Sequence, residues 1–268
     1  METVEDENKE DGNMLQIAPT EHLTGVTVRG DFQDFYELVD SIYRLCGLDD
    51  DREDIYYGVK NRLLGACYEI RHAFMGDREI ALCDNGMTED LMKYRDVAAP
   101  TQNVYYGTKL LFPEAIFLAA AVPEMMLFSS MEYGERGKLK HTDLPGLLYG
   151  DYLRDKANLY VFCSGIWQAL GTVIGDESLE KLMYLKERTH ETYMNYVTHY
   201  IDKCNIELLR APQEKRKDKL RNIAKRIIDK PKTYRNMEED LKYWAKEYKT
   251  SIYELEDPGL VYPEEMEW

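Results

Sequence analysis

The strongest constraint on how this chain can fold is the segment from Pro113 to Met131. It is rich in alanine and methionine and nearly uncharged, so its side chains must be shielded from water on almost every side. Pro113 favours a helix start at this point, because the first helical residues need no N–H partner. Pro123 and two glutamates keep the apolar run shorter than a membrane-crossing helix requires. We therefore expect a buried core helix here and no transmembrane segment.

Apolar side chains recur at helical or strand spacing along most of the remaining chain. Helices are predicted over residues 32–46, 51–74, 88–94, 151–174, 176–209, 213–230 and 237–249. Alternating apolar residues predict short strands near residues 15–17, 26–28, 80–83 and 104–111, and residues 132–149 are expected to form a loop. The expected fold class is mainly α with a small antiparallel sheet (α+β), as a single globular domain with a C-terminal helical extension.

Changes in composition divide the chain into three parts. Residues 1–13 are acidic and have few apolar side chains, which is typical of a disordered tail. Residues 14–210 contain most of the apolar periodicity and are expected to form the globular α+β core. Residues 211–268 are expected to form the helical extension, with a basic helix followed by an acidic helix and tail.

The cysteines and the start of the chain indicate a cytoplasmic protein. The five cysteines are odd in number, widely spaced and without a CxxC pair, which argues against a disulfide framework or a zinc ribbon. We expect reduced thiols, mostly in the core. The first residues lack the basic and apolar pattern of a secretion signal. The net charge of −16 favours solubility and repels nucleic acid in general.

The densest polar segment lies between residues 68 and 79. Acidic, basic and imidazole side chains this close together can shift one another's pKa values, as they do in active sites. The simpler interpretation, which we favour, is a helix C-terminus complemented by positive side chains. The candidate cluster consists of Glu69, Arg71, His72, Asp77, Arg78 and Glu79.

Two Glu-x-x-His pairs raise the alternative of a metal-dependent enzyme. Each pair falls on a predicted helix, and residues three positions apart share a helix face. Di-iron and di-manganese bundles combine two such pairs with two single glutamates. The candidate ligands for iron, manganese or zinc are Glu37, Glu69, His72, Glu114 (or Glu124), Glu187 and His190. Because chance pairs are common and the predicted strands do not suit a plain four-helix bundle, we expect no cofactor.

A basic segment precedes an acidic one near the end of the chain. Residues 214–235 contain ten Lys or Arg against three Asp or Glu, whereas residues 238–267 contain ten acidic and three basic side chains. An apolar stripe at Leu220, Ile223 and Ile227 is expected to pack on the body of the protein. The candidate basic patch is Lys215, Arg216, Lys217, Lys219, Arg221, Lys225 and Arg226.

Four interpretations of this basic helix stay open at the level of sequence, three with a binding partner and one without. A basic amphipathic helix can contact nucleic acid phosphates, an anionic membrane or an acidic protein surface. One acidic protein surface of this kind is the segment 238–267 of a second copy of this chain. The simplest interpretation, which we favour, is a packed surface helix whose charges are balanced by the acidic residues that follow it.

Three segments of the first half resemble a known protein family. They are LTGVTVRGD, ACYEIRHAFMGDREI and NVYYGTKLLFPE. Together they resemble an uncharacterised bacterial family of domains of unknown function, over roughly residues 14–130. The resemblance implies a bacterial, cytosolic protein and no particular activity, and the C-terminal half lies outside it.

No complete catalytic motif accompanies these features. GxSxG, HExxH, P-loop and GxGxxG patterns are absent from the sequence. The expected function is therefore a non-enzymatic binding or accessory protein that acts through protein–protein contacts or self-association. The alternatives are a metal-dependent enzyme built on the two Glu-x-x-His pairs and a nucleic-acid-binding regulator that uses the basic helix.

Overall fold

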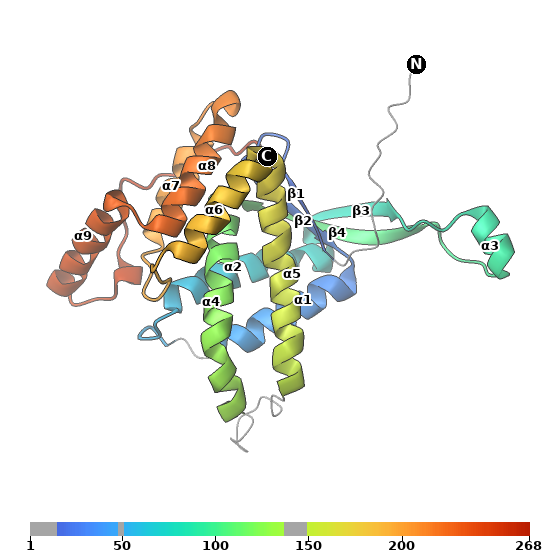
Figure 1. Ribbon diagram of the computed structural model, residues 1–268, viewed down its shortest axis with the longest axis horizontal. Coiled ribbons are helices and arrows are strands. Elements are labelled where there is room, and N and C mark those ends of the chain that lie inside the picture. The colour runs from blue at the N-terminus through green and yellow to red at the C-terminus, as the bar shows by residue number, and fades with distance from the viewer. Residues whose placement is uncertain (1–14, 48–50, 137–148) are drawn as a thin grey trace.

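The computed structural model describes residues 15–47, 51–136 and 149–268, and within these it is mainly helical with one small antiparallel sheet (Figure 1). The strands are β1 (Gln16–Pro19), β2 (Gly25–Gly30), β3 (Glu79–Asp84) and β4 (Gln102–Leu111). The helices are α1 (Phe32–Cys46), α2 (Tyr57–His72), α3 (Glu89–Arg95), α4 (Phe112–Arg136), α5 (Tyr149–Ile174), α6 (Asp176–Arg188), α7 (His199–Leu209), α8 (Gln213–Asp229) and α9 (Lys232–Tyr248). A π-helical turn, η1 (Ala73–Asp77), follows α2, and a 3-10 turn, η2 (Ile252–Glu254), follows α9. The expected α+β class is confirmed, and the predicted tail at residues 1–13 lies outside the described residues.

The core is built around α4 and α5, which run side by side through the middle of the molecule (Figure 1). Every residue of α4 from Ala115 to Val122 is fully buried, which confirms the core helix that the apolar segment predicts. By length and composition alone, the windows Phe112–Ser129 and Gly150–Ile174 are apolar enough to cross a membrane. In this fold 72% and 50% of those windows are buried, as happens in the core helices of soluble proteins. The expected absence of a transmembrane segment stays a prediction.

The sheet has the order β1-β2-β4-β3, with each neighbouring pair antiparallel. In the β2–β4 pair, Val26 lies opposite Leu110 and Val28 lies opposite Thr108, and all four side chains are buried on one face of the sheet. Helix α4 contacts both β2 and β4, while α1 contacts β2, α2 contacts β4 and α5 contacts β1. The same face continues along β4 into its outer part, which pairs with β3, because alternate residues of a strand point to the same side.

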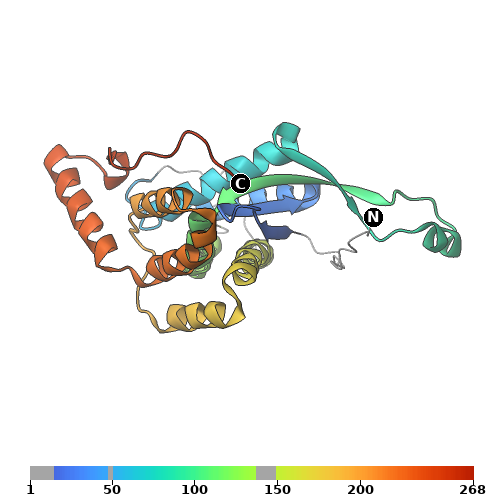
Figure 2. The same ribbon diagram turned by 90° about the horizontal axis from the view of Figure 1, so that it is seen from above.

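Helix α8 belongs to the same hydrophobic core as α4 and α5. Leu220, Ile223 and Ile227 are fully buried, as the apolar stripe predicts. Helix α9 extends from the body on one side, and the β3–α3–β4 segment extends on the opposite side (Figures 1 and 2). The C-terminal segment after η2 then runs back across the molecule and ends over the sheet (Figure 2).

The predicted helix over 176–209 is wrong, because the chain forms two helices there. Helix α6 ends at Arg188 and α7 begins at His199. Between them Asn195 adopts a left-handed backbone conformation, while the rings of Tyr193 and Tyr196 are buried in the core. Burial of these two aromatic rings is incompatible with a continuous surface helix. His190 therefore lies outside any helix, contrary to the prediction.

Other boundaries differ from the sequence predictions by a few residues or one turn. Helix α4 continues to Arg136 where a loop was expected from residue 132, and residues 137–148 lie outside the described part. Helix α9 begins at Lys232 rather than 237, directly after Pro231, and α2 begins at Tyr57 rather than 51. A proline can precede the first helical turn without loss of a hydrogen bond.

The start of α1 shows how local sequence sets both a helix boundary and a pH response. The Asp31 side chain accepts a hydrogen bond from the Asp34 N–H at 2.8 Å, and Asp34 accepts one in return from the Asp31 N–H at 3.0 Å. This reciprocal capping box ends the preceding strand and begins the helix. Burial, assisted by the nearby Asp31 and Glu37 carboxylates, raises the pKa of Asp34 to about 6.

Asp34→Asn should raise the thermal unfolding midpoint at pH 7. Between the ordinary pKa of 3.8 and the raised folded value of about 6, the folded state binds more protons at Asp34 than the unfolded state. The contribution of Asp34 to stability therefore increases as the pH falls through 6 and is lost as the pH rises. The two midpoints, measured by circular dichroism from pH 7 to pH 4, should converge toward pH 4. A constant difference between them would contradict this assignment.

Candidate functional site

The predicted polar cluster divides into separate ion pairs at the molecular surface. Arg78 Nε lies 2.9 Å from Glu69 Oε2, and His72 Nδ1 lies 2.8 Å from Asp77 Oδ2. The side chains of Glu69, Asp77 and Arg78 are each at least a third exposed. Such exposed pairs contribute little to stability. The arrangement supports the simpler interpretation of a solvated helix end.

The remaining two members of that cluster have partners elsewhere. Glu79 forms an ion pair with Arg29 of β2 at 2.5 Å. The Arg71 guanidinium lies 5.7 Å from the centre of the Tyr68 ring and 3.4 Å from the Tyr43 hydroxyl. The six residues therefore do not converge on one catalytic centre.

The candidate metal ligands are dispersed over the fold. Glu37 accepts a hydrogen bond from Gln33 at 2.7 Å on α1, and Glu114 of α4 is paired with Arg62 of α2 at 3.0 Å. Glu124 accepts hydrogen bonds from the Tyr56 hydroxyl and from the Thr192 hydroxyl. In residues 15–47, 51–136 and 149–268, no three His, Cys, Asp or Glu side chains are placed to hold a metal ion.

The two Glu-x-x-His pairs accordingly do not form a shared site. The first pair, Glu69 and His72, is occupied by the ion pairs at the end of α2. The second pair is not helical throughout, because α6 ends between Glu187 and His190. The metal-dependent alternative requires the two pairs to converge, and the described residues do not bring them together, because the second pair is interrupted by the break between α6 and α7.

The basic patch on α8 is largely paired within the protein. Lys219 and Arg226 both bind Glu207 of α7, at 2.8 and 2.5 Å. Arg216 is buried and donates to two backbone carbonyl oxygens, and Arg221 pairs with Asp218. The expected balance by residues 238–267 is thus wrong for these side chains, because Glu207 lies on the neighbouring helix. The exposed remainder is Lys215, Lys217 and Lys225.

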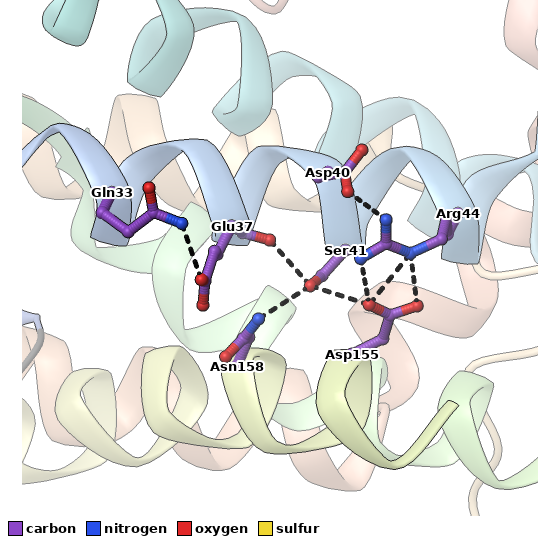
Figure 3. Close-up of polar contacts among 7 residues, drawn as sticks. All are labelled: Gln33, Glu37, Asp40, Ser41, Arg44, Asp155 and Asn158. Carbon is purple, nitrogen blue, oxygen red and sulfur yellow. Dashed lines mark hydrogen bonds and ion pairs between the residues drawn. The ribbon is translucent and has the colours of Figure 1, made fainter. Parts of the chain in front are cut away.

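A buried polar network between α1 and α5 was not predicted from the sequence (Figure 3). Asp155 is fully buried and accepts hydrogen bonds from Arg44 Nε at 2.8 Å and Nη2 at 2.5 Å, and from the Ser41 hydroxyl at 3.0 Å. Asn158 donates to Ser41 at 3.0 Å, and Asp40 is also paired with Arg44. These contacts tie the two helices together, and this role is structural. Arg44 and Asp155 are 111 residues apart, so no local pattern indicates their pairing.

The clearest candidate for a functional surface is the arm, which we define as β3, α3 and the outer part of β4, residues 79–106. It extends away from the helical body (Figures 1 and 2). In its register Ile80 lies opposite Tyr106 and Leu82 lies opposite Val104. The exposed fractions are 56% for Ile80, 65% for Leu82 and 45% for Val104.

The apolar face of the arm continues the core face of the sheet. Val104, Tyr106, Thr108 and Leu110 alternate along β4 and so point to the same side. Thr108 and Leu110 are buried under the helices, whereas Val104 lies beyond them and is exposed. A face of core-like composition is therefore left uncovered by the described part of the chain. Exposed apolar patches of this kind mark interaction surfaces.

Acidic side chains surround the outer end of the arm. Asp84 ends β3, Glu89 and Asp90 form the first turn of α3, and Asp96 follows that helix. Lys93 and Arg95 in the last turn of α3 offset part of this charge, with the Lys93 ammonium 3.8 Å from both Glu89 and Asp90, so the end of the arm stays acidic on balance. Helix α3 has no buried residue, and its Tyr94 is 88% exposed. The arm thus combines an apolar face with an acidic rim. The sequence predicts its strands and short helix, but the alternation there does not indicate that the apolar side faces solvent.

The family model described as "Domain of unknown function (DUF6904)" matches residues 15–268. The chain belongs to this family. The resemblance seen in the first half is thereby confirmed as membership of an uncharacterised domain family, and it extends through the C-terminal half, contrary to expectation. Searches of curated proteins and of solved structures gave no match.

The DUF6904 match carries no activity, so inferences about function depend on the geometry of the molecule. The match spans the arm, the helical core and the C-terminal segment alike. Bacterial origin and a cytoplasmic location stay predictions.

Proposed function

We propose that this DUF6904 protein is a non-enzymatic binding protein that acts through protein–protein contacts made by the arm. The observation that carries the proposal is the uncovered continuation of the core face at Ile80, Leu82 and Val104. Burial of apolar surface is the main favourable term in protein association, at about 25 cal/mol per Å². Leu82 is more than half exposed and lies beside the exposed Ile80 and Val104, so a partner that covered these side chains would gain free energy from their burial.

The partner that suits this surface is a basic amphipathic segment of another protein. Its apolar side chains would cover the arm face, and its lysines or arginines would meet the acidic rim at Asp84, Glu89 and Asp90. A second copy of this chain is less suitable, because two molecules of net charge −16 repel each other. The proposed complex should weaken as salt rises, since the rim charges are exposed and screened.

The nucleic-acid alternative has less support than the arm. Four of the seven residues of the predicted basic patch are paired or buried within the protein: Arg216, Lys219, Arg221 and Arg226. A surface that binds phosphates needs several free cationic side chains. The metal-dependent alternative lacks a convergent set of ligands in the described residues.

A defined peptide pair tests the proposed surface. The probe is a fluorescent 18-residue Leu/Lys peptide with leucines at helical spacing, and its matched control is the same peptide with glutamate in place of lysine. The double variant Leu82→Ser with Val104→Ser should weaken binding of the Leu/Lys peptide at least tenfold in fluorescence anisotropy. Its melting temperature should stay within a degree or two of wild type, because both residues are exposed.

Leu153→Ser supplies the matched control, because Leu153 is a similarly exposed leucine on α5. It should leave peptide affinity unchanged. Equal loss in both variants, or equal binding of the Leu/Glu peptide, would contradict the assignment to the arm. Concentration-dependent dimerisation of the wild type in light scattering, lost in the Leu82/Val104 variant, would identify a second copy as the occupant and overturn the proposed partner.

A further inference from the structure

A groove of about 620 Å³ lies between α9 and the C-terminal segment, on the side of the body opposite the arm (Figures 1 and 2). Its first wall is one face of α9, where Asn236, Asp240, Trp244 and Tyr248 follow one another at helical spacing. Its second wall is the segment 255–258. The groove is therefore formed mainly by the acidic part of the chain that follows the basic helix.

Contacts with the body hold both walls in place. Tyr234 near the start of α9 is 1% exposed, and its ring centre lies 4.7 Å from that of Tyr196. The Tyr234 hydroxyl accepts a hydrogen bond from the Val197 N–H at 3.1 Å. On the second wall, His199 Nε2 donates to the Leu255 carbonyl oxygen at 2.7 Å. The groove is thus formed without a ligand, which lowers the entropic cost of binding one.

Two exposed aromatic rings lie along the α9 wall. Trp244 is 48% exposed and Tyr248 is 67% exposed. Their rings are stacked, with the centres 5.6 Å apart and 19° between the planes. Tyr243 packs edge-on against the Trp244 ring at 5.1 Å. Tryptophan and tyrosine are enriched among the residues that dominate binding at interfaces, so these rings indicate a contact surface.

The charges of the groove are negative on balance. Its lining contains three carboxylates, Asp240, Glu256 and Asp257, and one ammonium group, Lys203. Asp257 accepts a hydrogen bond from the Gly259 N–H at 2.8 Å, but none of the four charges is in an ion pair within the described part of the chain. One positive charge thus faces three negative ones. A cationic ligand is favoured here, and the phosphates of nucleic acid would be repelled.

The polar groups beside the aromatic rings suit an extended ligand. Among the described residues, none accepts a hydrogen bond from the Trp244 indole N–H, the Tyr248 hydroxyl or the Asn236 amide. A polyproline II segment has no internal hydrogen bonds, so its carbonyl oxygens are free to accept from such donors, whereas a helix uses its own. The face from Thr233 to Tyr248 is about 22 Å long at the helical rise, which about seven polyproline II residues would span.

We propose that this groove binds a proline-rich segment of another protein that carries arginine. Aromatic-lined grooves bind proline-rich segments because the ligand is already extended and loses little entropy. Its proline rings lie against Trp244 and Tyr248, and its arginine pairs with Asp240 or Glu256. The groove is independent of the proposed function of the arm, because no groove-lining residue belongs to residues 79–106.

Three labelled peptides test this proposal on the full chain. The probe is fluorescein-labelled RPPLPPLPPR, and its binding is measured by fluorescence anisotropy. The charge control is EPPLPPLPPE, and the conformational control is RAALAALAAR. Both controls should bind at least tenfold more weakly than the probe, because the first loses the attraction to the carboxylates and the second loses the preformed extended conformation.

Tyr248→Ala tests the aromatic wall and should weaken binding of the probe at least fivefold. Tyr184→Ala is the matched control, because Tyr184 is 59% exposed on α6 and lies outside the groove. It should leave the affinity within twofold of wild type. Both variants should keep the melting temperature of wild type, since both rings are mostly exposed.

The double variant Asp240→Asn with Glu256→Gln tests the charges and should weaken binding of the probe at least tenfold. Glu239→Gln is its matched control, because Glu239 is an exposed carboxylate on α9 that does not line the groove. It should leave the affinity within twofold of wild type. The loss in the double variant should shrink as salt is added, because these carboxylates are exposed and screened.

Four results would overturn the proposal. The first is no detectable binding of RPPLPPLPPR at high micromolar protein concentration. The second is equal affinity for RAALAALAAR, which would indicate attraction between charges alone. The third is unchanged binding of the probe in both Tyr248→Ala and the double carboxylate variant, which would place the peptide elsewhere. The fourth is tighter binding of labelled oligothymidylate than of the probe, which would identify a nucleic acid surface.

Discussion

Phe117→Ala should lower the free energy of unfolding by about 3–5 kcal/mol, the range for removing a large aromatic side chain from a packed core. Phe117 is fully buried on α4, and its ring centre lies 4.8 Å from that of Tyr196 and 5.9 Å from that of Tyr193. Its removal would leave a cavity where α4 meets the segment between α6 and α7. Urea denaturation followed by circular dichroism measures the change.

Phe128→Ala is the control on the same helix. Phe128 is 50% exposed, so the same chemical change should cost less than about 1 kcal/mol. Similar losses in the two variants would mean that the Phe117 ring is not in the core.

Asp155→Ala should destabilise the protein by about 3–5 kcal/mol, because it leaves the Arg44 guanidinium partly buried without its main carboxylate partner. The fully buried Asp155 also accepts a hydrogen bond from Ser41, whose hydroxyl would keep only the Glu37 carbonyl oxygen as an acceptor. The same denaturation experiment measures the loss. The exposed pair of Asp218 and Arg221 provides the comparison, and Asp218→Ala should cost less than about 1 kcal/mol.

A double variant separates the charge effect from packing at this position. Arg44→Leu combined with Asp155→Leu removes both charges and substitutes apolar side chains, so it should recover a large part of the stability that Asp155→Ala loses. Failure to recover any stability would show that the wider hydrogen-bond network in Figure 3, through Ser41 and Asn158, is the dominant contribution.

The elements that the sequence predicts well are those governed by neighbours within a few residues. The apolar stripe of α8 and the uncharged segment of α4 each depend on side chains within a few helical turns. The prediction of β2 and β4 likewise depends on neighbours, because it rests on the alternation of residues two positions apart. The cysteines were expected to form no disulfide framework and to lie mostly in the core, and all five are free, with four of them buried.

The candidate sites depend on contacts that local patterns do not encode. The Glu-x-x-His pairs have suitable spacing, but spacing within a helix does not determine whether two helices meet. Arg62 finds Glu114 and Asp202 from positions 52 and 140 residues away. Glu207, rather than the acidic tail, balances Lys219 and Arg226 because α7 packs beside α8.

The break between α6 and α7 shows the same limit within the fold itself. Periodicity favours one helix there, but burial of Tyr193 and Tyr196 against Phe117 gains more than a few helical hydrogen bonds. Two further features are not encoded by local patterns. The arm leaves apolar residues exposed, and the C-terminal segment places Trp268 beside Gly25.

Local sequence was thus sufficient for most helices, strands and caps of this protein, because hydrogen bonds and apolar periodicity act over one or two turns. Tertiary structure alone decided which charges pair, which apolar face stays exposed and where the C-terminal segment lies. The physical reason is that these outcomes depend on a competition between burial and desolvation among residues far apart in the chain.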